Sequence, residues 1–176
     1  MNDLTPLPSC GVTLVIGLPE REPLLDLVAR LARQGPLHVL VGGNRFDAHR
    51  LARLVRRQTV QVDAILARVQ VARPFTCYQT LTLLEYAQGD MPLLVLDLLA
   101  TFADDSISDQ ESTRLLMLAA AHLRRCGQQA TVLVTAQPLS TPERQRLTTL
   151  LQNAADQVIT YQPPQSLTQL SLELWD

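Results

Sequence analysis

Short β-rich apolar runs alternate with segments of helical spacing along most of this chain, and this alternation is the strongest restriction on its fold. The apolar runs predict strands over residues 11–17, 37–41, 66–71, 92–99 and 130–136. The segments between them predict helices over residues 23–34, 47–57, 77–87, 108–126 and 141–153. This order predicts an α/β fold, in which helices cover a mostly parallel central sheet.

Two features place the elements more closely. Residues 92–99 are apolar throughout except for Asp97, which is typical of a central parallel strand that is covered on both faces. Thr76 and Ser108 each begin a capping box, with Gln or Glu three residues later, so they predict where two helices start.

The end of the chain has a different pattern. A β-rich run at residues 157–161 is followed by two prolines and then by alternating Leu170, Leu172 and Leu174, which predicts a closing antiparallel strand pair within residues 157–175. With 176 residues, 47% of them hydrophobic, the chain is long enough for one full core and short for two. We therefore expect a single domain, residues 1–176, with its main core at about residues 11–160.

Composition limits the choice of partners. Charged residues make up 18% of the chain and the formal net charge is -2, so overall charge favours neither nucleic acid nor anionic lipid. The first residues do not read as a signal peptide and Asp97 interrupts the longest apolar run, so we expect a soluble cytoplasmic protein with no membrane contact. The three cysteines and three histidines lack the spacing of a disulfide framework or a metal site.

Several segments, taken in order, resemble the ATPase core of the RecA and RadA recombinases, which belong to the P-loop NTPase superfamily. The resemblance rests on Phe46-x-x-x-Arg50-Leu51, on VQVARPF at residues 69–75 with the helix after it, on LLVLD at 93–97 and on VLVTAQ at 132–137. It implies a RecA-like three-layer α/β/α fold with antiparallel strands at the C-terminal end. It also implies that Asp97 is the Walker B metal ligand and that Gln137 is a sensor beside the nucleotide.

The same resemblance places the nucleotide-binding phosphate loop at eight consecutive residues, which are Gly17, Leu18, Pro19, Glu20, Arg21, Glu22, Pro23 and Leu24. A working loop has the pattern G-x-x-x-x-G-K-[ST], in which the lysine binds phosphate and the hydroxyl binds Mg²⁺. Here Glu22, Pro23 and Leu24 occupy the last three positions. No other alignment supplies the lysine, because all 15 basic residues of the chain are arginine. We therefore interpret this stretch as a turn into a helix that starts with proline.

The catalytic glutamate of the family is also missing, because Gly42 or Gly43 stands at its position. A general base contributes about 10²- to 10⁴-fold to a rate, so ATP hydrolysis is not expected. Asp97 and Gln137 are then vestigial, and no cofactor is expected unless a partner completes an ATP and Mg²⁺ site. The two DNA-binding loops of the family correspond to residues 103–111 and 138–142. The first loop is acidic and the second is very short, so direct DNA binding there is not expected.

A cluster of basic residues remains, made up of Arg45, Arg50, Arg53, Arg56 and Arg57. Arg50, Arg53 and Arg57 share one face of the expected helix, opposite its apolar residues. This face is either solvated or a contact for a partner or nucleic acid.

The leading hypothesis is a non-catalytic RecA-like domain, a pseudo-ATPase, that acts as a protein-interaction or regulatory module in DNA recombination or repair. RecA-type cores associate through the nucleotide face, so the expected partner is a second copy or an active recombinase. One alternative is an ATPase or switch that a partner subunit completes. Another is a SulA-like regulator of cell division or stress, whose target would form filaments.

Overall fold

The computed structural model describes residues 7–43 and 46–161, and its centre is one six-stranded sheet in which all strands run parallel. The strand order across the sheet is β3-β2-β4-β5-β1-β6. The strands are β1 (Gly11–Ile16), β2 (Leu37–Val41), β3 (Val69–Ala72), β4 (Leu93–Leu96), β5 (Thr131–Ala136) and β6 (Gln157–Thr160).

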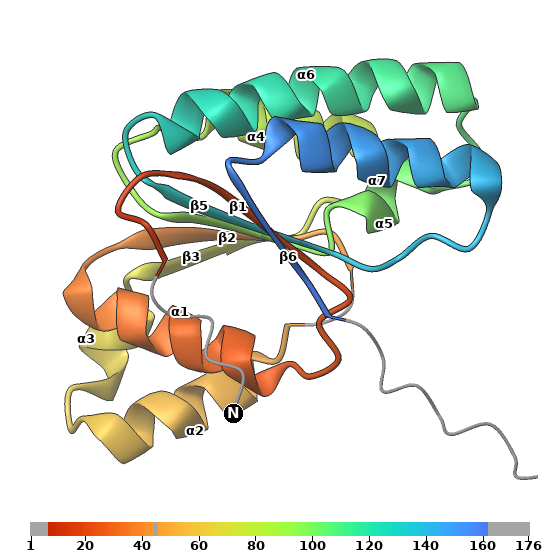
Figure 1. The fold of residues 1–176 in the computed structure, drawn as a ribbon. Coiled ribbons are helices and arrows are strands. Elements are labelled where there is room, and N and C mark those ends of the chain that lie inside the picture. Colours follow the sequence, from red (N-terminus) through yellow and green to blue (C-terminus); the bar gives the residue numbers. More distant parts are fainter. Residues whose placement is uncertain (1–6, 44–45, 162–176) are drawn as a thin grey trace, which may run out of the picture.

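Helices cover both faces of this sheet, so the described chain forms three layers (Figure 1). One layer holds α1 (Glu22–Gln34), α2 (Ala48–Gln58) and α3 (Val62–Leu66). The other holds α4 (Cys77–Tyr86), α6 (Asp109–Gly127) and α7 (Pro142–Ala154), while the short α5 (Leu99–Phe102) follows the carboxyl end of β4. The expected α/β fold with a sheet between two helical layers is confirmed.

The strand β4 shows why the sheet is central to the core. Leu93 and Val95 belong to the apolar cluster of α4, α6 and α7, whereas Leu94 and Leu96 belong to the cluster of α1, α2 and α3. All four side chains are at most 1% exposed. A strand that is buried on both faces has no polar face, so its sequence is continuously apolar. The prediction that this strand lies in the middle of the sheet is confirmed.

Side-chain caps begin three of the helices. The Thr76 hydroxyl accepts a hydrogen bond from the backbone N–H of Gln79 at 3.2 Å, and the Ser108 hydroxyl accepts one from Glu111 at 3.3 Å. The carboxylate of Asp47 caps α2 in the same way, through the N–H of Arg50 at 2.9 Å. Such caps satisfy N–H groups that have no partner within the helix. Both predicted capping residues, Thr76 and Ser108, are confirmed.

The prediction of an antiparallel strand pair at residues 157–175 is wrong for the strand that the structure describes, β6. The strand β6 pairs with β1 in parallel, with Ile159 opposite Val15. The physical reason is that α7 carries the chain back along the sheet, and a helical crossover of this kind returns the next strand in the same direction. The rest of the expected pair, with Leu170, Leu172 and Leu174, lies outside the described residues.

Two short helices, α3 and α5, include residues that were expected to lie in strands. Val62–Leu66 forms α3, whose Ile65 is buried in the cluster of α1 and α2, so the third strand begins only at Val69. The fourth strand ends at Leu96 rather than at residue 99, because Asp97 has a φ of 53°. A left-handed backbone cannot continue a strand. Of the helices within the described ranges, none has the length and apolar character needed to cross a membrane.

Candidate functional site

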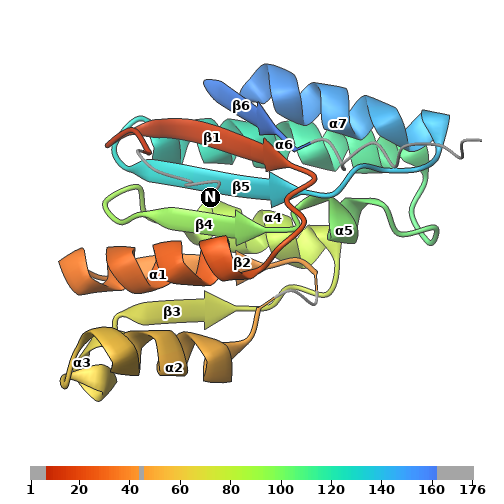
Figure 2. The same cartoon turned by 60° about the horizontal axis from the view of Figure 1, so that its bottom comes forward.

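The carboxyl ends of β4, β5 and β1 lie next to one another at one edge of the sheet (Figure 2). Asp97 follows β4, Gln137 follows β5 and Gly17 follows β1. The structure therefore brings together the three segments that were expected to form the phosphate loop, the Walker B strand end and the sensor. Ligands of parallel α/β sheets bind at the carboxyl ends of the strands, so this edge is the candidate site.

The loop after β1 is held as a tight turn. Gly17 has a φ of 72°, and its N–H donates to the carbonyl of Ala136 at 2.9 Å. A β-carbon on Gly17 would lie 2.8 Å from the carbonyl oxygen of Tyr161, so glycine is required here by backbone conformation and by space. The next residue, Leu18, is buried, and its carbonyl accepts a hydrogen bond from the side-chain amide of Gln137 at 3.2 Å. The amide of Gln137 thus holds the loop.

The first turn of α1 does not have the groups that a phosphate needs. Pro23 has no N–H, and Glu22 places a carboxylate in this turn. The Glu22 carboxylate pairs with Arg50 of α2, which fixes a negative charge at the helix start. A carboxylate stabilises a helix N-terminus, so it takes the electrostatic role that a phosphate would have. Leu24, where the resemblance would place a Mg²⁺-binding hydroxyl, is only 4% exposed and belongs to the core.

Asp97 lies in a buried turn. The residue is 6% exposed, and its N–H donates to the hydroxyl of Thr135 on β5 at 2.9 Å. Its carbonyl accepts a hydrogen bond from the N–H of Ala100 at 3.0 Å, at the start of α5. Aspartate tolerates a left-handed backbone better than most residues, so its type is explained by the turn without a metal ion.

The glycines after β2 pack directly against this turn. A β-carbon on Gly42 would lie 2.6 Å from the carbonyl oxygen of Asp97. A β-carbon on Gly43 would lie 2.7 Å from the Oδ2 atom of the same residue. Neither position has room for a side chain while Asp97 keeps this conformation. The Asp97 turn therefore occupies the space beside the position at which the resemblance would place a glutamate.

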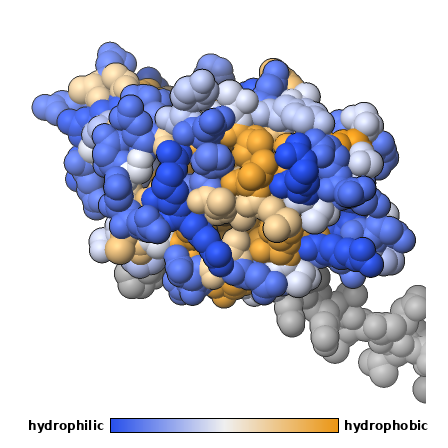
Figure 3. Space-filling view, turned by 90° about the horizontal axis from the view of Figure 1, so that it is seen from above, coloured by the Kyte–Doolittle hydropathy of each residue, from blue (hydrophilic) through white to orange (hydrophobic). Residues whose placement is uncertain are grey.

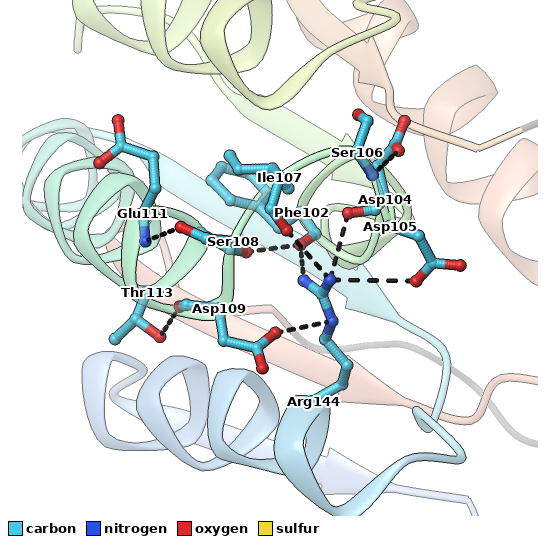
Figure 4. A network of polar contacts seen from close by, with 11 residues as sticks. Phe102, Asp104, Asp105, Ser106, Ile107, Ser108, Asp109, Glu111, Thr113 and Arg144 are labelled. Atoms are coloured by element: carbon cyan, nitrogen blue, oxygen red, sulfur yellow. Dashed lines mark hydrogen bonds and ion pairs between the residues drawn. The ribbon is translucent and has the colours of Figure 1, made fainter.

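The acidic segment expected to correspond to the first DNA loop is folded against the body of the protein by Arg144 (Figure 4). The guanidinium of Arg144 donates to the carbonyls of Phe102 at 3.0 Å, Asp104 at 3.2 Å and Ile107 at 3.3 Å. It also pairs with the carboxylate of Asp109 at 3.2 Å. The side chain of Arg144 is only 12% exposed, and its contacts hold residues 102–109 against α7.

Hydrogen bonds within this segment stabilise its negative charges. The N–H of Ser106 donates to the Asp104 carboxylate at 2.8 Å and lowers the pKa of that group below its ordinary value. The bidentate contact from Arg114 lowers the pKa of Glu111 in the same way. The segment is therefore anionic at neutral pH, which is unfavourable for binding a DNA backbone. The second expected loop, residues 138–142, lies in the short connection from β5 to α7. The helix α7 begins at Pro142.

The arginine cluster is only partly free for a partner. Arg50 pairs with Glu22, and Arg45 lies outside the described residues. Arg53, Arg56 and Arg57 are exposed on α2, and within the described chain no carboxylate forms an ion pair with them.

The other candidate ligands are not assembled into a site. Within residues 7–43 and 46–161, no group of three His, Cys, Asp or Glu side chains could hold a metal ion. Cys77 and Cys126 are free and buried, and burial raises the pKa of both thiols.

An exposed apolar corner beside β3 and α4 was not expected from the sequence. We use the term apolar corner for four exposed side chains, namely Val71, Phe75, Tyr78 and Tyr86. Phe75 is 80% exposed and Tyr86 is 78% exposed. Hollows of about 490 Å³ and 290 Å³ lie beside them and share Ala72 and Leu83. The sequence contained no clear signal for this surface, because apolar residues next to a strand are usually core residues.

Comparison with known proteins adds no family to this description. No family model matches the chain, and no curated protein matches it.

Proposed function

We propose that this protein is a non-catalytic RecA-like domain, a pseudo-ATPase, that acts in the cytoplasm as a protein-association module in DNA recombination or repair. The proposal takes its setting from the sequence resemblance described above. It is supported by the position of the three motif-like segments, which end on the neighbouring strands β4, β5 and β1. The order of the segments in the sequence alone does not require this arrangement.

The contact between Asp97 and the glycines after β2 carries the non-catalytic part of the proposal. A nucleotide site of this family needs a phosphate lysine, a hydroxyl for Mg²⁺ and a glutamate for water. The corresponding positions hold Pro23, the buried Leu24 and a glycine against which Asp97 is packed. No single substitution restores such a site, because three groups are lost, two of them in α1 and one after β2.

The apolar corner supports the association part. Monomeric proteins rarely keep several large apolar side chains together in water, and such patches commonly mark protein contacts. The corner also borders β3, which is an edge strand whose outer backbone groups are open to pairing. An extended segment of a partner could pair with this edge while its side chains enter the adjacent hollows. The proposed partner is a second copy of the chain or an active recombinase.

Thermal unfolding with and without ATP and Mg²⁺ tests the non-catalytic part. A ligand that binds the folded state at 100 times its Kd adds about 2.7 kcal/mol of stability, so binding is readily seen. We expect no change in Tm at millimolar ATP. ATP hydrolysis that Asp97→Ala abolishes would contradict the proposal. A shift in Tm that needs a second protein would instead favour an ATPase completed by a partner.

Sedimentation equilibrium tests the association part. We expect the purified chain to self-associate or to bind a purified recombinase, and we expect Phe75→Ser with Tyr86→Ser to weaken this association. Val60→Ser is the matched control, because Val60 is 97% exposed and lies outside the apolar corner. Equal association of the wild type and the double variant would remove the apolar corner as the contact surface.

A further inference from the structure

A groove runs between α6 and α7 on the outer face of the molecule. Its volume is about 580 Å³, and its floor is apolar, formed mainly by Met117, Ala121 and Leu150. Met117 is 60% exposed, although it lies in the middle of a long helix. Figure 3 views this face and shows apolar surface near its centre, bordered by hydrophilic side chains. An exposed methionine within an apolar floor is typical of a surface that another segment covers.

One end of this groove is positively charged. Arg124 donates to the carbonyls of Asn153 and Ala154, at 2.7 Å and 3.0 Å, at the end of α7. Arg125 donates to carbonyls near the end of α4, including Glu85 at 2.9 Å. Both side chains are thus held in place by neutral acceptors, and no carboxylate of the described ranges forms an ion pair with either. The groove therefore fits a segment that is apolar and acidic.

The end of the chain has this composition. Residues 162–176 contain four leucines, the chain's only tryptophan and two acidic residues, and they contain no arginine; Glu173 and Asp176 are the acids and Trp175 is the tryptophan. These fifteen residues can span up to about 50 Å when extended. The described chain ends at Tyr161, one residue past the four-residue β6, and β6 begins just after the groove residue Ala154. A path back along β6 and over α7 needs roughly 13 Å plus one layer of about 10 Å. Residues 162–169, at about 3.3 Å each, are long enough to span it.

We infer that the groove between α6 and α7 binds residues 170–176 of the same molecule. In this arrangement the leucines and Trp175 cover the floor at Met117 and Leu150, and the acidic side chains lie near Arg124 and Arg125. The inference goes beyond the proposed function and does not depend on it, because the groove is separate from the apolar corner and from the candidate nucleotide edge. The end of the chain would cover this groove. A partner peptide that is also apolar and acidic would have to displace it.

Trp175 makes the inference directly testable, because all tryptophan fluorescence of the full chain comes from this one residue. We expect the emission of the folded wild type to lie at shorter wavelength than that of a synthetic peptide of residues 162–176, with weaker quenching by iodide. Met117→Asp and Leu150→Asp should each shift the emission to that of the free peptide. Circular dichroism checks that both variants remain folded, and Met117 is exposed enough that its replacement should not disturb the core.

Two control variants separate this groove from other places that could cover the tryptophan. Val60→Asp introduces the same charge at an exposed site on the opposite helical layer and should leave the emission unchanged. Val158→Asp alters the outer strand β6, where Val158 is 40% exposed. The inference is wrong if Val158→Asp shifts the emission and Met117→Asp does not. It is also wrong if the wild-type emission equals that of the peptide, or if the shift depends on protein concentration.

A second measurement does not rely on substituting the groove. In the full chain, Glu173→Gln with Asp176→Asn should move the emission of Trp175 to longer wavelength, and added salt should have a similar effect. Emission that neither this double variant nor added salt changes would overturn the inference. An effect of ATP on any of these readings would concern the proposed function alone.

Discussion

Asp97 and Gly43 are in such close contact that a β-carbon on the glycine would lie 2.7 Å from the Oδ2 atom of the aspartate and 2.8 Å from its Cβ atom. Real β-carbon atoms essentially never lie this close to another heavy atom, so one of the two residues has to be glycine while the turn is kept. Asp97 adopts a φ of 53° to make this contact. The pair joins the segments that follow β2 and β4, and it leaves no room for a side chain at position 43.

Gly43→Ala should therefore destabilise the protein by about 1–3 kcal/mol, because its β-carbon would overpack the buried Asp97. Asp97→Gly in the same chain should recover part of the loss, because it removes the clashing side chain and suits the positive φ. Urea denaturation of the two single variants and the double variant gives the coupling free energy. Gly35→Ala is the control, since nothing lies within 4 Å of a β-carbon there. Additive effects in the double variant would show that the contact is not formed.

Arg144→Gln should loosen residues 102–109. The guanidinium supplies hydrogen bonds to three backbone carbonyls and is mostly buried, so we expect a loss of about 2–3 kcal/mol. Hydrogen exchange should become faster in this segment, from Phe102 to Asp109. Arg146→Gln, an exposed change on the same helix, should alter stability by less than about 0.5 kcal/mol. Unchanged exchange in residues 102–109 would show that Arg144 does not hold them.

Acid should weaken the fold through groups whose pKa is lowered in the folded state. The pKa of Asp47 is lowered chiefly by the N–H of Arg50, that of Asp104 by Ser106 and that of Glu111 by Arg114. A lowered pKa stabilises the folded state above the ordinary values of 3.8 for Asp and 4.5 for Glu, and this stabilisation is lost as the pH falls below them. Urea midpoints measured between neutral pH and acid should fall most steeply there.

Replacement of the three acidic groups tests the cause of this pH dependence. A chain with Asp47→Asn, Asp104→Asn and Glu111→Gln should show a flatter decline in the acid range than the wild type. Its midpoint at neutral pH should be lower, because the charged acceptors are gone. An equally steep decline in both chains would assign the acid sensitivity to other carboxylates.

The exposed arginines of α2 should matter for binding rather than for stability. Arg53→Gln, Arg56→Gln and Arg57→Gln together should change the free energy of unfolding by less than about 0.5 kcal/mol for each site. If the chain binds duplex DNA at low salt, the slope of log K against log salt should fall in magnitude by up to about 0.9 for each lost phosphate contact. A control with Arg21, Arg33 and Arg146 changed to Gln has the same net charge. An equal loss of binding in both variants would argue against a contact at α2.

Most of the fold could be predicted from local patterns, because strand and helix periods are properties of neighbouring residues. The apolar run at Leu93–Leu96 and the caps at Thr76 and Ser108 were identified for this reason. The helix α3 and the direction of β6 were not. Both depend on packing between distant segments, namely Ile65 against α1 and α2, and β6 against β1 after the crossover of α7.

The candidate site shows the same division. The sequence by itself determined which chemical groups are present. It shows that the chain has no lysine and that Glu, Pro and Leu occupy positions 22–24. Only the tertiary structure decided how the remaining groups are used. In the folded chain Asp97 packs against Gly43, and the Gln137 side-chain amide donates to the Leu18 carbonyl. Arg144 donates to a backbone carbonyl at the start of the acidic segment. These contacts join residues far apart in the chain, and their geometry follows from the packing of the sheet rather than from any local sequence preference.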